Sequence, residues 1–447
     1  MSFQRTIIAI VSAVSASATS GALPTRYVVQ ELPVFCNPAI PDDATKCGAY
    51  SYGNDINDNG VITGYAQGAI VVDSEDRDGD GNTTEEIRDF SVHAFRWSNN
   101  TLTDLGDLGA GQSYGNAINN SGVIVGRSNV VAGTTEGGAE IVEFRGFAAS
   151  PGEEMVQIAD PALISINSLV ANDIDSAGYI VGTVGVKLFN DDDAFYSRGF
   201  VRSPVDNAVI LIPSLEETTA SVLRAVESSR DIAVGYSIRN ERERAISVSL
   251  SDPSVIVEIG DLGGGSSSAT DVNQSGVIVG ASSVDSSGVT EGFFYTSGVA
   301  PQIKSIGVLN SKYRFSSARA INDAGIIVGV SVESTSPTTY RAIAYDISSE
   351  RLVNLNNLID CNEILSERWT LVEAVAINNS GQIIGYGAKG NTSKGFLLTP
   401  DTSGAEPLAC APSEGDFENH SGGGGVSFWL SGLFILLFLL RRKACFT

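Results

Sequence analysis

Apolar and polar positions alternate along this chain in a pattern that recurs seven times. In each copy a short apolar stretch ends in Ile or Val followed by Asn, Asp or Glu, a turn comes next, and a β-branched run ends in Gly. The copies begin at Ile56, Ile118, Ile174, Val226, Val272, Ile321 and Ile377. Repeats of about 50 residues indicate units that stack or close into a ring, because a single unit cannot bury its apolar side alone.

Each copy contains four stretches with the composition of a β-strand. The first is an apolar run ending in Leu, as at 102–109 and 255–263. The second ends in the Ile/Val-Asn pair, and the third is the Ile-Val-Gly run. The fourth is aromatic, as at 93–97, 145–150, 198–203, 291–296, 341–346 and 394–399, and it is degenerate in the fourth copy, at 244–250.

Seven copies of four strands predict an all-β fold of about 28 short antiparallel strands. An open sheet of that size would expose edges that promote aggregation, whereas a radial array leaves few of them. We therefore predict a seven-bladed β-propeller over residues 23–410. The chain begins with a strand of the first type at 26–33 and ends with one of the fourth type at 394–400. The ring closes if the stretch 26–33 is the outermost strand of the last blade.

The repeated Asn-x-x-Gly segment has a local explanation. Asn folds its side chain onto the backbone in an Asx-turn, and Gly adopts the positive φ that a tight hairpin needs. The repeated Asn and Asp residues are therefore predicted to form turns rather than to bind ligands. The recurring aromatic residues are predicted to lie in the core.

Function is then expected in what does not repeat. Successive connections between antiparallel strands lie on alternate faces, and the Asn-x-x-Gly turns share one face with the hairpins after the aromatic strands. The long insertions fall in the other set of connections, at 36–47, 66–92, 128–142, 183–196 and 360–370. We call the first the smooth face and the second the insertion face. Loops on a rigid scaffold are where binding sites usually lie.

The same elements carry a resemblance to a known family. The INxxGxIVG and LGxLGG segments, together with His93-Ala94-Phe95, resemble the HAF-repeat family of bacterial proteins, which are predicted to be extracellular. The resemblance covers residues 26–400 and implies export, but the family brings no settled biochemical activity. His93 occurs in one copy alone, so we do not interpret it as a site residue.

Composition excludes several classes of function. The formal net charge of −24 disfavours nucleic acid and anionic lipid as partners, because phosphate binding needs clustered Lys and Arg. The chain contains only two histidines, His93 and His420, which argues against multi-His zinc sites and most His-based catalysis.

Both ends of the chain resemble export signals. Residues 1–22 combine Arg5, an apolar run over 7–14 and small residues, which predicts a signal peptide cleaved after Ala18 or Ala22. At the other end a Gly-rich linker (411–425) precedes an apolar segment (426–440) and a basic tail (441–447). Fifteen residues span about 22 Å as a helix, short of the roughly 30 Å hydrocarbon core. The basic cluster places the end of this segment in the cytoplasm.

This tail resembles the GlyGly-CTERM sorting signal of Gram-negative bacteria. The resemblance implies export, cleavage near Gly422–Gly425 by a rhomboid-like intramembrane protease, and release or attachment at the cell surface. The membrane is then contacted only through the C-terminal helix of the precursor. The residues Ala444-Cys445-Phe446-Thr447 after the basic cluster depart from the pattern, and an ordinary C-terminal anchor is the alternative.

Export permits disulfides. Cys36 and Cys47 lie in one insertion, and Cys410 follows the last strand while Cys361 lies in the last repeat. We predict the pairs Cys36–Cys47 and Cys361–Cys410. Cys445 would be lost with the tail.

The insertion 66–92 contains a candidate calcium loop. Asp76, Asp78 and Asp80 alternate, Gly81 follows, and Asn82 and Glu85 come shortly after. Oxygen ligands at alternate positions around a Gly turn can wrap one Ca²⁺, although the spacing is not that of an EF-hand. A solvated acidic loop is the alternative. We interpret the run Asp191–Asp193 as a solvated charge cluster.

Two functions of different class fit these features. The first is an exported, non-enzymatic propeller that displays a face for binding an unidentified surface protein or glycan. The second is a secreted glycan hydrolase or lyase that uses paired carboxylates. The segment 111–115, GQSYG, formally matches a nucleophile elbow but lacks the strand-to-helix context, so we interpret it as a connection between blades.

Overall fold

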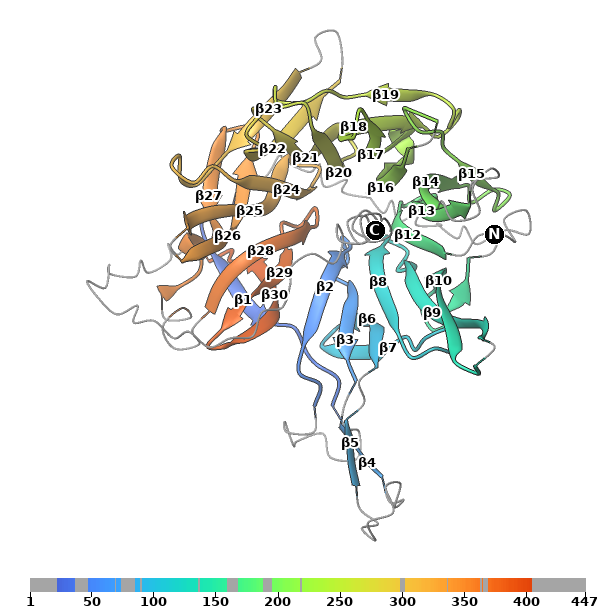
Figure 1. Cartoon of the computed structure of the whole chain (residues 1–447). Helices are drawn as coiled ribbons and strands as arrows, with labels where there is room; N and C mark the ends of the chain where they lie inside the picture. Colours follow the sequence, from blue (N-terminus) through green and yellow to red (C-terminus); the bar gives the residue numbers. More distant parts are fainter. Residues whose placement is uncertain are drawn as a thin grey trace, which may run out of the picture. The chain divides into compact units, whose positions relative to one another are not determined.

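A computed structural model describes residues 22–36, 47–68, 70–73, 85–88, 91–135, 137–158, 168–187, 195–217, 219–297, 302–335, 337–361, 364 and 369–403. These residues form seven four-stranded antiparallel sheets arranged radially around a central axis, which confirms the predicted seven-bladed propeller (Figure 1). A separate two-stranded sheet, β4 (Ile70–Asp73) with β5 (Glu85–Arg88), lies within one insertion.

The blades follow one another in chain order. Blades 1 and 2 contain β2 (Ser51–Ile56), β3 (Ile62–Gln67), β6 (Val92–Ser98), β7 (Thr101–Asp104), then β8 (Ser113–Ile118), β9 (Ile124–Thr134), β10 (Glu140–Ala149) and β11 (Val156–Gln157). Blades 3 and 4 contain β12 (Ser168–Ile174), β13 (Ile180–Lys187), β14 (Phe195–Arg202), β15 (Val209–Leu211), then β16 (Ser221–Glu227), β17 (Ile232–Arg239), β18 (Arg242–Ser249) and β19 (Ile256–Glu258). Blades 5 and 6 contain β20 (Ser267–Val272), β21 (Val277–Ser283), β22 (Thr290–Thr296), β23 (Gln302–Gly307), then β24 (Ser316–Ile321), β25 (Ile326–Thr335), β26 (Thr338–Asp346) and β27 (Arg351–Asn354). Blade 7 contains β28 (Trp369–Ile377), β29 (Ile383–Lys389), β30 (Thr392–Pro400) and β1 (Tyr27–Glu31).

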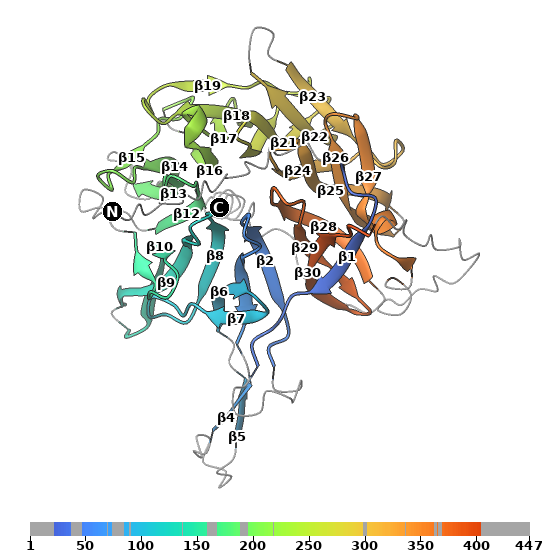
Figure 2. The same cartoon turned by 180° about the vertical axis from the view of Figure 1, so that it is seen from behind.

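The ring closes through the N-terminal strand. β1 pairs antiparallel with β30, with Tyr27 opposite Pro400, and so forms the outermost strand of blade 7. Figure 2 shows β1 lying beside β30. The innermost strand of blade 7, β28, contacts that of blade 1, β2, which completes the circle. The predicted closure is confirmed.

The turns after the innermost strands form as predicted. In blade 1 the Oδ1 atom of Asn57 accepts hydrogen bonds from the N–H groups of Asn59 and Val61, both at 3.0 Å, and Gly60 has a φ of +73°. Blade 4 reaches the same geometry differently. A short 3-10 helix, η3 (Ser228–Arg230), is followed by Asp231. Asp231 has a φ of 55°, so it adopts the left-handed conformation that Gly adopts in the other turns.

The Gly of each Ile-Val-Gly run has a packing role that the sequence did not reveal. All seven innermost strands contain a β-bulge, and the Gly of the adjacent strand lies directly against it. A Cβ atom added to Gly280 would lie 2.1 Å from the carbonyl oxygen of Ser268 and 2.9 Å from the ring of Phe293. Only Gly fits there, because a backbone oxygen cannot rotate away.

The aromatic strands supply the core. Phe95, Phe147, Phe200, Phe293 and Phe396 are fully buried, as predicted. Each belongs to an apolar cluster that combines residues of neighbouring blades, such as Phe293 with Ala225 and Val234 of blade 4. The blades are therefore held to one another by apolar packing as well as by hydrogen bonds.

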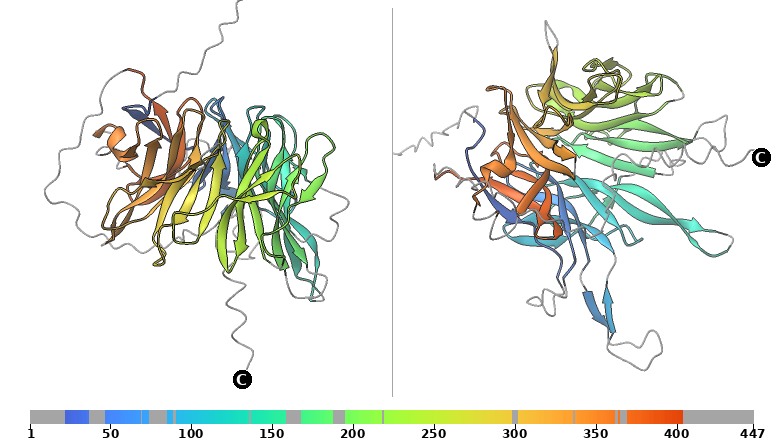
Figure 3. Two further views of the ribbon diagram at one scale, coloured as in Figure 1. Left: turned by 90° about the horizontal axis from the view of Figure 1, so that it is seen from above. Right: turned by 60° about the vertical axis from the view of Figure 1, so that its left-hand side comes forward.

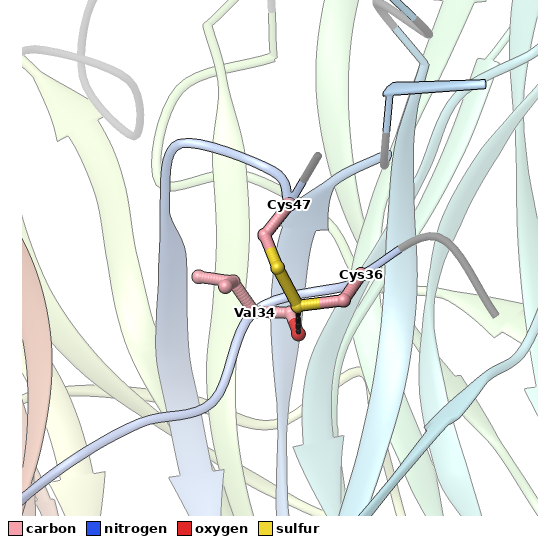
Figure 4. Close-up of a disulfide and its surroundings, with 3 residues drawn as sticks. All are labelled: Val34, Cys36 and Cys47. Carbon is pink, nitrogen blue, oxygen red and sulfur yellow. Dashed lines mark hydrogen bonds between the residues drawn. A yellow bond between two sulfur atoms is a disulfide. The ribbon is translucent and has the colours of Figure 1, made fainter. Parts of the chain in front are cut away.

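The insertions differ from one another in structure. A disulfide joins Cys36 and Cys47 and closes the first of them, as predicted (Figure 4). The β4–β5 hairpin extends away from blade 1 (Figures 1 and 3). We expected an insertion over 128–142, but most of that segment continues β9 and β10 as one long hairpin.

The second predicted disulfide gives a testable outcome. Cys361 is disulfide-bonded, but its partner lies outside the described residues. We expect non-reducing peptide mapping of the exported protein to recover Cys361 linked to Cys410, because Cys410 follows the last strand directly. A Cys361–Cys445 peptide, or a free Cys410, would contradict the pairing.

Both predicted targeting segments lie almost wholly outside the described residues. The signal peptide over 1–22 is described only at Ala22, and the segments 411–425, 426–440 and 441–447 are not described. Within the described ranges, no helix has the length and apolar character needed to cross a membrane.

Candidate functional site

The smooth-face end of the central channel is lined by the repeated turns. It forms a hollow of about 170 Å³ whose wall includes the repeated Asn and Asp residues. Side-chain amides bridge five of the seven blade junctions, through Asn57 Nδ2 to Asn119 O (2.9 Å), Asn119 to Asp175 (3.1 Å), Asn273 to Asn322 (3.0 Å), Asn322 to Asn378 (3.2 Å) and Asn378 to Asn57 (3.0 Å). Between blades 3 and 4, Asp175 Oδ2 accepts a hydrogen bond from the N–H of Ser228 at 3.0 Å. The side-chain oxygen of each such Asn thus accepts hydrogen bonds from its own turn, and the side-chain nitrogen donates one to the next blade. These residues have a structural role in the turns, as predicted. Their hydrogen bonds between blades were not predicted from the sequence.

Three aspartates lie one step further into the channel, in blades 1, 3 and 5. Asp55, Asp173 and Asp271 each accept one N–H from the next residue and one from the following blade, at 2.7–2.8 Å. The other four blades carry alanine at this position, namely Ala117, Ala225, Ala320 and Ala376. Burial raises the pKa of Asp55 to about 6, and the charge of Asp58 adds to this rise. Burial raises the pKa of Asp271 to about 7, and the charges of Asp55 and Asp323 add to it. The pKa of Asp173 is raised well above its usual value for the same reasons.

Buried serines fasten the start of the innermost strands. Ser113 Oγ accepts a hydrogen bond from Ala94 N at 2.8 Å and donates one to Gly106 O at 2.5 Å. Ser267 and Ser316 repeat this arrangement in blades 5 and 6. Ser113 is the serine of the GQSYG segment and begins β8, so this segment is partly strand and its hydroxyl is fully buried and committed to two backbone groups. It cannot act as a nucleophile.

The insertion-face end of the innermost strands is where the blades differ most. Paired positions on the two inner strands carry Tyr52 and Tyr65 in blade 1, Tyr114 and Arg127 in blade 2, and Glu373 and Tyr386 in blade 7. The same positions carry Val170 and Thr183, Ser268 and Ala281, and Ser317 and Val330 in blades 3, 5 and 6. Blade 4 carries Val222 and Tyr236 there, and the tyrosine is buried. Large polar and aromatic side chains therefore gather over three adjacent blades.

We call this surface the aromatic arc, defined as Tyr50, Tyr52, Tyr65, Tyr114, Arg127, Phe144 and Tyr386. All seven side chains are partly exposed. Ring centroids lie 5.3 Å apart for Tyr50–Tyr52, 5.6 Å for Tyr52–Tyr65, 6.3 Å for Tyr52–Tyr386 and 5.1 Å for Tyr65–Tyr114. The guanidinium of Arg127 lies 4.5 Å from the centre of Tyr114 and 4.8 Å from that of Phe144. The arc is a continuous series of edge and stacked contacts that holds its rings in place.

One carboxylate contacts the arc. The buried side chain of Glu373 accepts a hydrogen bond from the hydroxyl of Tyr386 through Oε2 and pairs with Arg319 of blade 6 through Oε1. Burial, and then the charge of Glu373, raises the pKa of Tyr386 above its usual range. Tyr386 therefore stays protonated and is a hydrogen-bond donor, not a nucleophile.

His93 has a structural explanation. Its Nδ1 lies 2.9 Å from Asp104 Oδ2 and its Nε2 lies 3.4 Å from Asp107 Oδ2. Arg244 occupies the equivalent position in blade 4 and pairs with Asp261 at 3.0 Å. In both blades the basic side chain at this position contacts an Asp residue of the connection that leads to the next blade.

The predicted calcium ligands Asp76, Asp78, Asp80 and Asn82 lie outside the described residues, and Glu85 begins β5. The hairpin brings Asp73 opposite Glu85, and the residues between them, 74–84, lie outside the described ranges. The hypothesis of a Ca²⁺ site at this loop stays a prediction. Among the described residues no group of three or more His, Cys, Asp or Glu side chains is placed to hold a metal ion.

We expect isothermal titration of the full chain with Ca²⁺ to show one binding event that Asp78→Asn/Asp80→Asn removes, because each substitution deletes a charged oxygen ligand. Asp191→Asn/Asp193→Asn, in an acidic run that we interpret as solvated, is the matched control and should leave binding unchanged. Equal titrations of all three proteins would contradict the site.

Comparisons with known proteins found a partial family match and several distantly similar solved structures. Residues 265–405, which span the last three blades, match a family described as protein of unknown function (DUF3466). No curated protein matches the chain. Among solved structures, a puromycin-hydrolysing peptidase of Mycobacterium tuberculosis is 12% identical with a TM-score of 0.44, covering 85% of this chain and 57% of that one. TolB of Acinetobacter baumannii is 12% identical, with a TM-score of 0.36 and coverage of 69% and 75%. A sialidase of Trypanosoma rangeli is 8% identical, with a TM-score of 0.37 and coverage of 83% and 58%.

Proposed function

We propose that this protein is an exported, non-enzymatic propeller that binds a glycan at the aromatic arc. The observation that carries the proposal is the gathering of five partly exposed tyrosines over three adjacent blades. At the paired positions the other four blades carry Val, Thr, Ser or Ala, apart from Tyr236 of blade 4, which is buried. Partly exposed aromatic rings stack against the C–H faces of sugars, and their hydroxyl groups supply hydrogen bonds. The arc lies on the insertion face, where the loops that do not repeat would add further contacts.

The chemistry of the arc favours binding over catalysis. Glycoside hydrolysis by carboxyl groups uses two of them, separated by about 5–9.5 Å across the scissile bond. The acidic group in contact with the arc is Glu373, and both of its oxygens already have partners. The channel aspartates hold backbone N–H groups between blades. The alternative function is a secreted carboxylate-based hydrolase or lyase. Cleavage of a bound glycan would reveal it.

The proposed location is the cell surface or the medium. Export is supported by the Cys36–Cys47 disulfide, because disulfides persist in oxidising environments. The predicted N-terminal signal and the predicted sorting-type tail also support it. We expect mass spectrometry of the exported protein to find no peptide from Phe428 onward, because cleavage near the glycines would remove the apolar segment. Recovery of intact 433–441 from the surface or extracellular protein would mean that the tail is an ordinary anchor.

Glycan-array binding of the full chain tests the arc. We expect Tyr52→Ala/Tyr114→Ala to weaken the strongest binding at least about tenfold, because both substitutions remove a stacking ring; a nucleic-acid base stacked on an aromatic ring gains about 1–3 kcal/mol. Tyr340→Ala removes an exposed tyrosine of β26 outside the arc and is the matched control. If the arc variant binds as well as the control while its melting temperature is unchanged, the proposed site is wrong.

A further inference from the structure

A second cavity lies far from the arc, at the outer edge of blade 6. It has a volume of about 570 Å³, within the range typical of small-molecule sites. Its wall combines the outermost strand β27, the 3-10 helix η4 (Leu355–Leu358) and Thr25, which precedes the closing strand β1. The connection from blade 5 and the end of β25 complete it. Thr25 is the contribution of the N-terminal segment to this wall.

Several polar groups in this wall have no partner. The guanidinium of Arg351, the amide of Asn357 and the hydroxyl of Thr25 are exposed and make no hydrogen bond or ion pair within the described part of the chain. Glu333 adds a carboxylate that is already neutralised, since its Oε2 lies 2.9 Å from Arg341 Nε and its Oε1 accepts from Asn354 Nδ2 at 3.4 Å. Donors and acceptors of both kinds therefore face one hollow.

The wall also contains four aliphatic side chains, beside the polar Asn310 and Asn354. Val353 and Leu358 are buried, and Leu309 and Leu352 are partly buried beside them. A wall that combines aliphatic side chains with amide, hydroxyl, guanidinium and carboxylate groups has the chemistry to bind a pyranose. A pyranose ring has an apolar face and hydroxyl groups around its edge. A simple anion would be attracted by Arg351 but disfavoured by the net charge of −24. An uncharged ligand avoids that conflict.

We infer that this cavity binds a neutral saccharide of one or two rings. The site is separate from the aromatic arc, because its walls come from blades 5 and 6 and the N-terminal segment, whereas the arc belongs to blades 7, 1 and 2. The inference therefore stands or falls independently of the proposed function. Arg351 and Asn357 would donate to ring hydroxyls, and Glu333 would accept from one.

Saturation-transfer NMR on the full chain tests the cavity. The probes are cellobiose, maltose and N,N′-diacetylchitobiose, with glucuronate and lysine as charged alternatives. We expect at least one neutral disaccharide to receive saturation from the protein. Arg351→Ala/Asn357→Ala should weaken that disaccharide at least tenfold, whereas Lys304→Ala, which removes an exposed cation of the outer strand of blade 5, should not. Tyr52→Ala/Tyr114→Ala should leave it unchanged.

Each contrary result overturns the inference. No transfer to any neutral disaccharide, or transfer to glucuronate or lysine alone, would mean that the cavity does not take a neutral saccharide. Transfer that is lost in the arc variant but kept in the cavity variant would assign the binding to the arc. Unchanged melting temperatures of both variants ensure that unfolding is not the cause of a loss.

Discussion

Gly280→Ala is expected to destabilise the propeller by about 3 kcal/mol or more, as judged from denaturant unfolding. The new Cβ would lie 2.1 Å from the carbonyl oxygen of Ser268, at the bulge of the neighbouring strand, and 2.9 Å from the ring of Phe293. Neither neighbour can retreat, because the oxygen belongs to the backbone of β20 and the ring is fully buried. The strand pairing and the core would have to shift together.

The matched control for this change is Gly133→Ala. Gly133 also lies in a strand, β9, but an added Cβ would meet no atom within 4 Å. Its free energy of unfolding should change by less than about 0.5 kcal/mol. Similar losses for the two variants would mean that the bulge contact does not explain why Gly recurs there.

Asp271→Ala is expected to cost less stability at pH 8 than at pH 5, with the difference near 2 kcal/mol. Burial and then the nearby charges of Asp55 and Asp323 raise the pKa of Asp271 from 3.8 to about 7 in the folded protein. The folded state therefore retains a proton that the unfolded state has released between about pH 4 and pH 7. The contribution of Asp271 to the free energy of unfolding is therefore fully present below pH 4 and is lost as the pH rises through 7.

Alanine is a natural choice for this test, because four blades carry it at the same position. At pH 5 the variant should be less stable than the parent, since the N–H groups of Val272 and Ile321 lose their acceptor. Unfolding curves at pH 5 and pH 8 measure both effects. Asp206→Ala, at an exposed turn, is the surface control. A cost for Asp271→Ala that grows with pH would contradict the assignment.

The architecture follows from the sequence because the repeat determines local structure. Each Asn-x-x-Gly turn, as at Asn57 and Gly60, needs only neighbours four residues away. The alternation of apolar residues gives the strands, and the number of copies gives the blades. The N-terminal strand could be assigned to the last blade because the chain would otherwise lack one strand there.

The candidate site could not be predicted in the same way. Tyr52, Tyr114 and Tyr386 lie far apart in the chain and become neighbours only when the strand register and the closed ring are known. The bulges shift that register by one residue in every innermost strand, which no composition rule reveals. A comparison of the seven copies by position would have found the signal. Five residues before the first turn residue, the first two copies carry Tyr, the next four carry Val or Ser, and the last carries Glu.

The central claim is that the arc binds a glycan without cleaving it. The most direct measurement is the mass of a glycan retained by the full chain, recovered after prolonged incubation. The account predicts a glycan of unchanged mass that is released from Tyr52→Ala/Tyr114→Ala more readily than from Tyr340→Ala. Shortened products, or products with the mass of an eliminated, unsaturated sugar, would show turnover and would make the protein an enzyme.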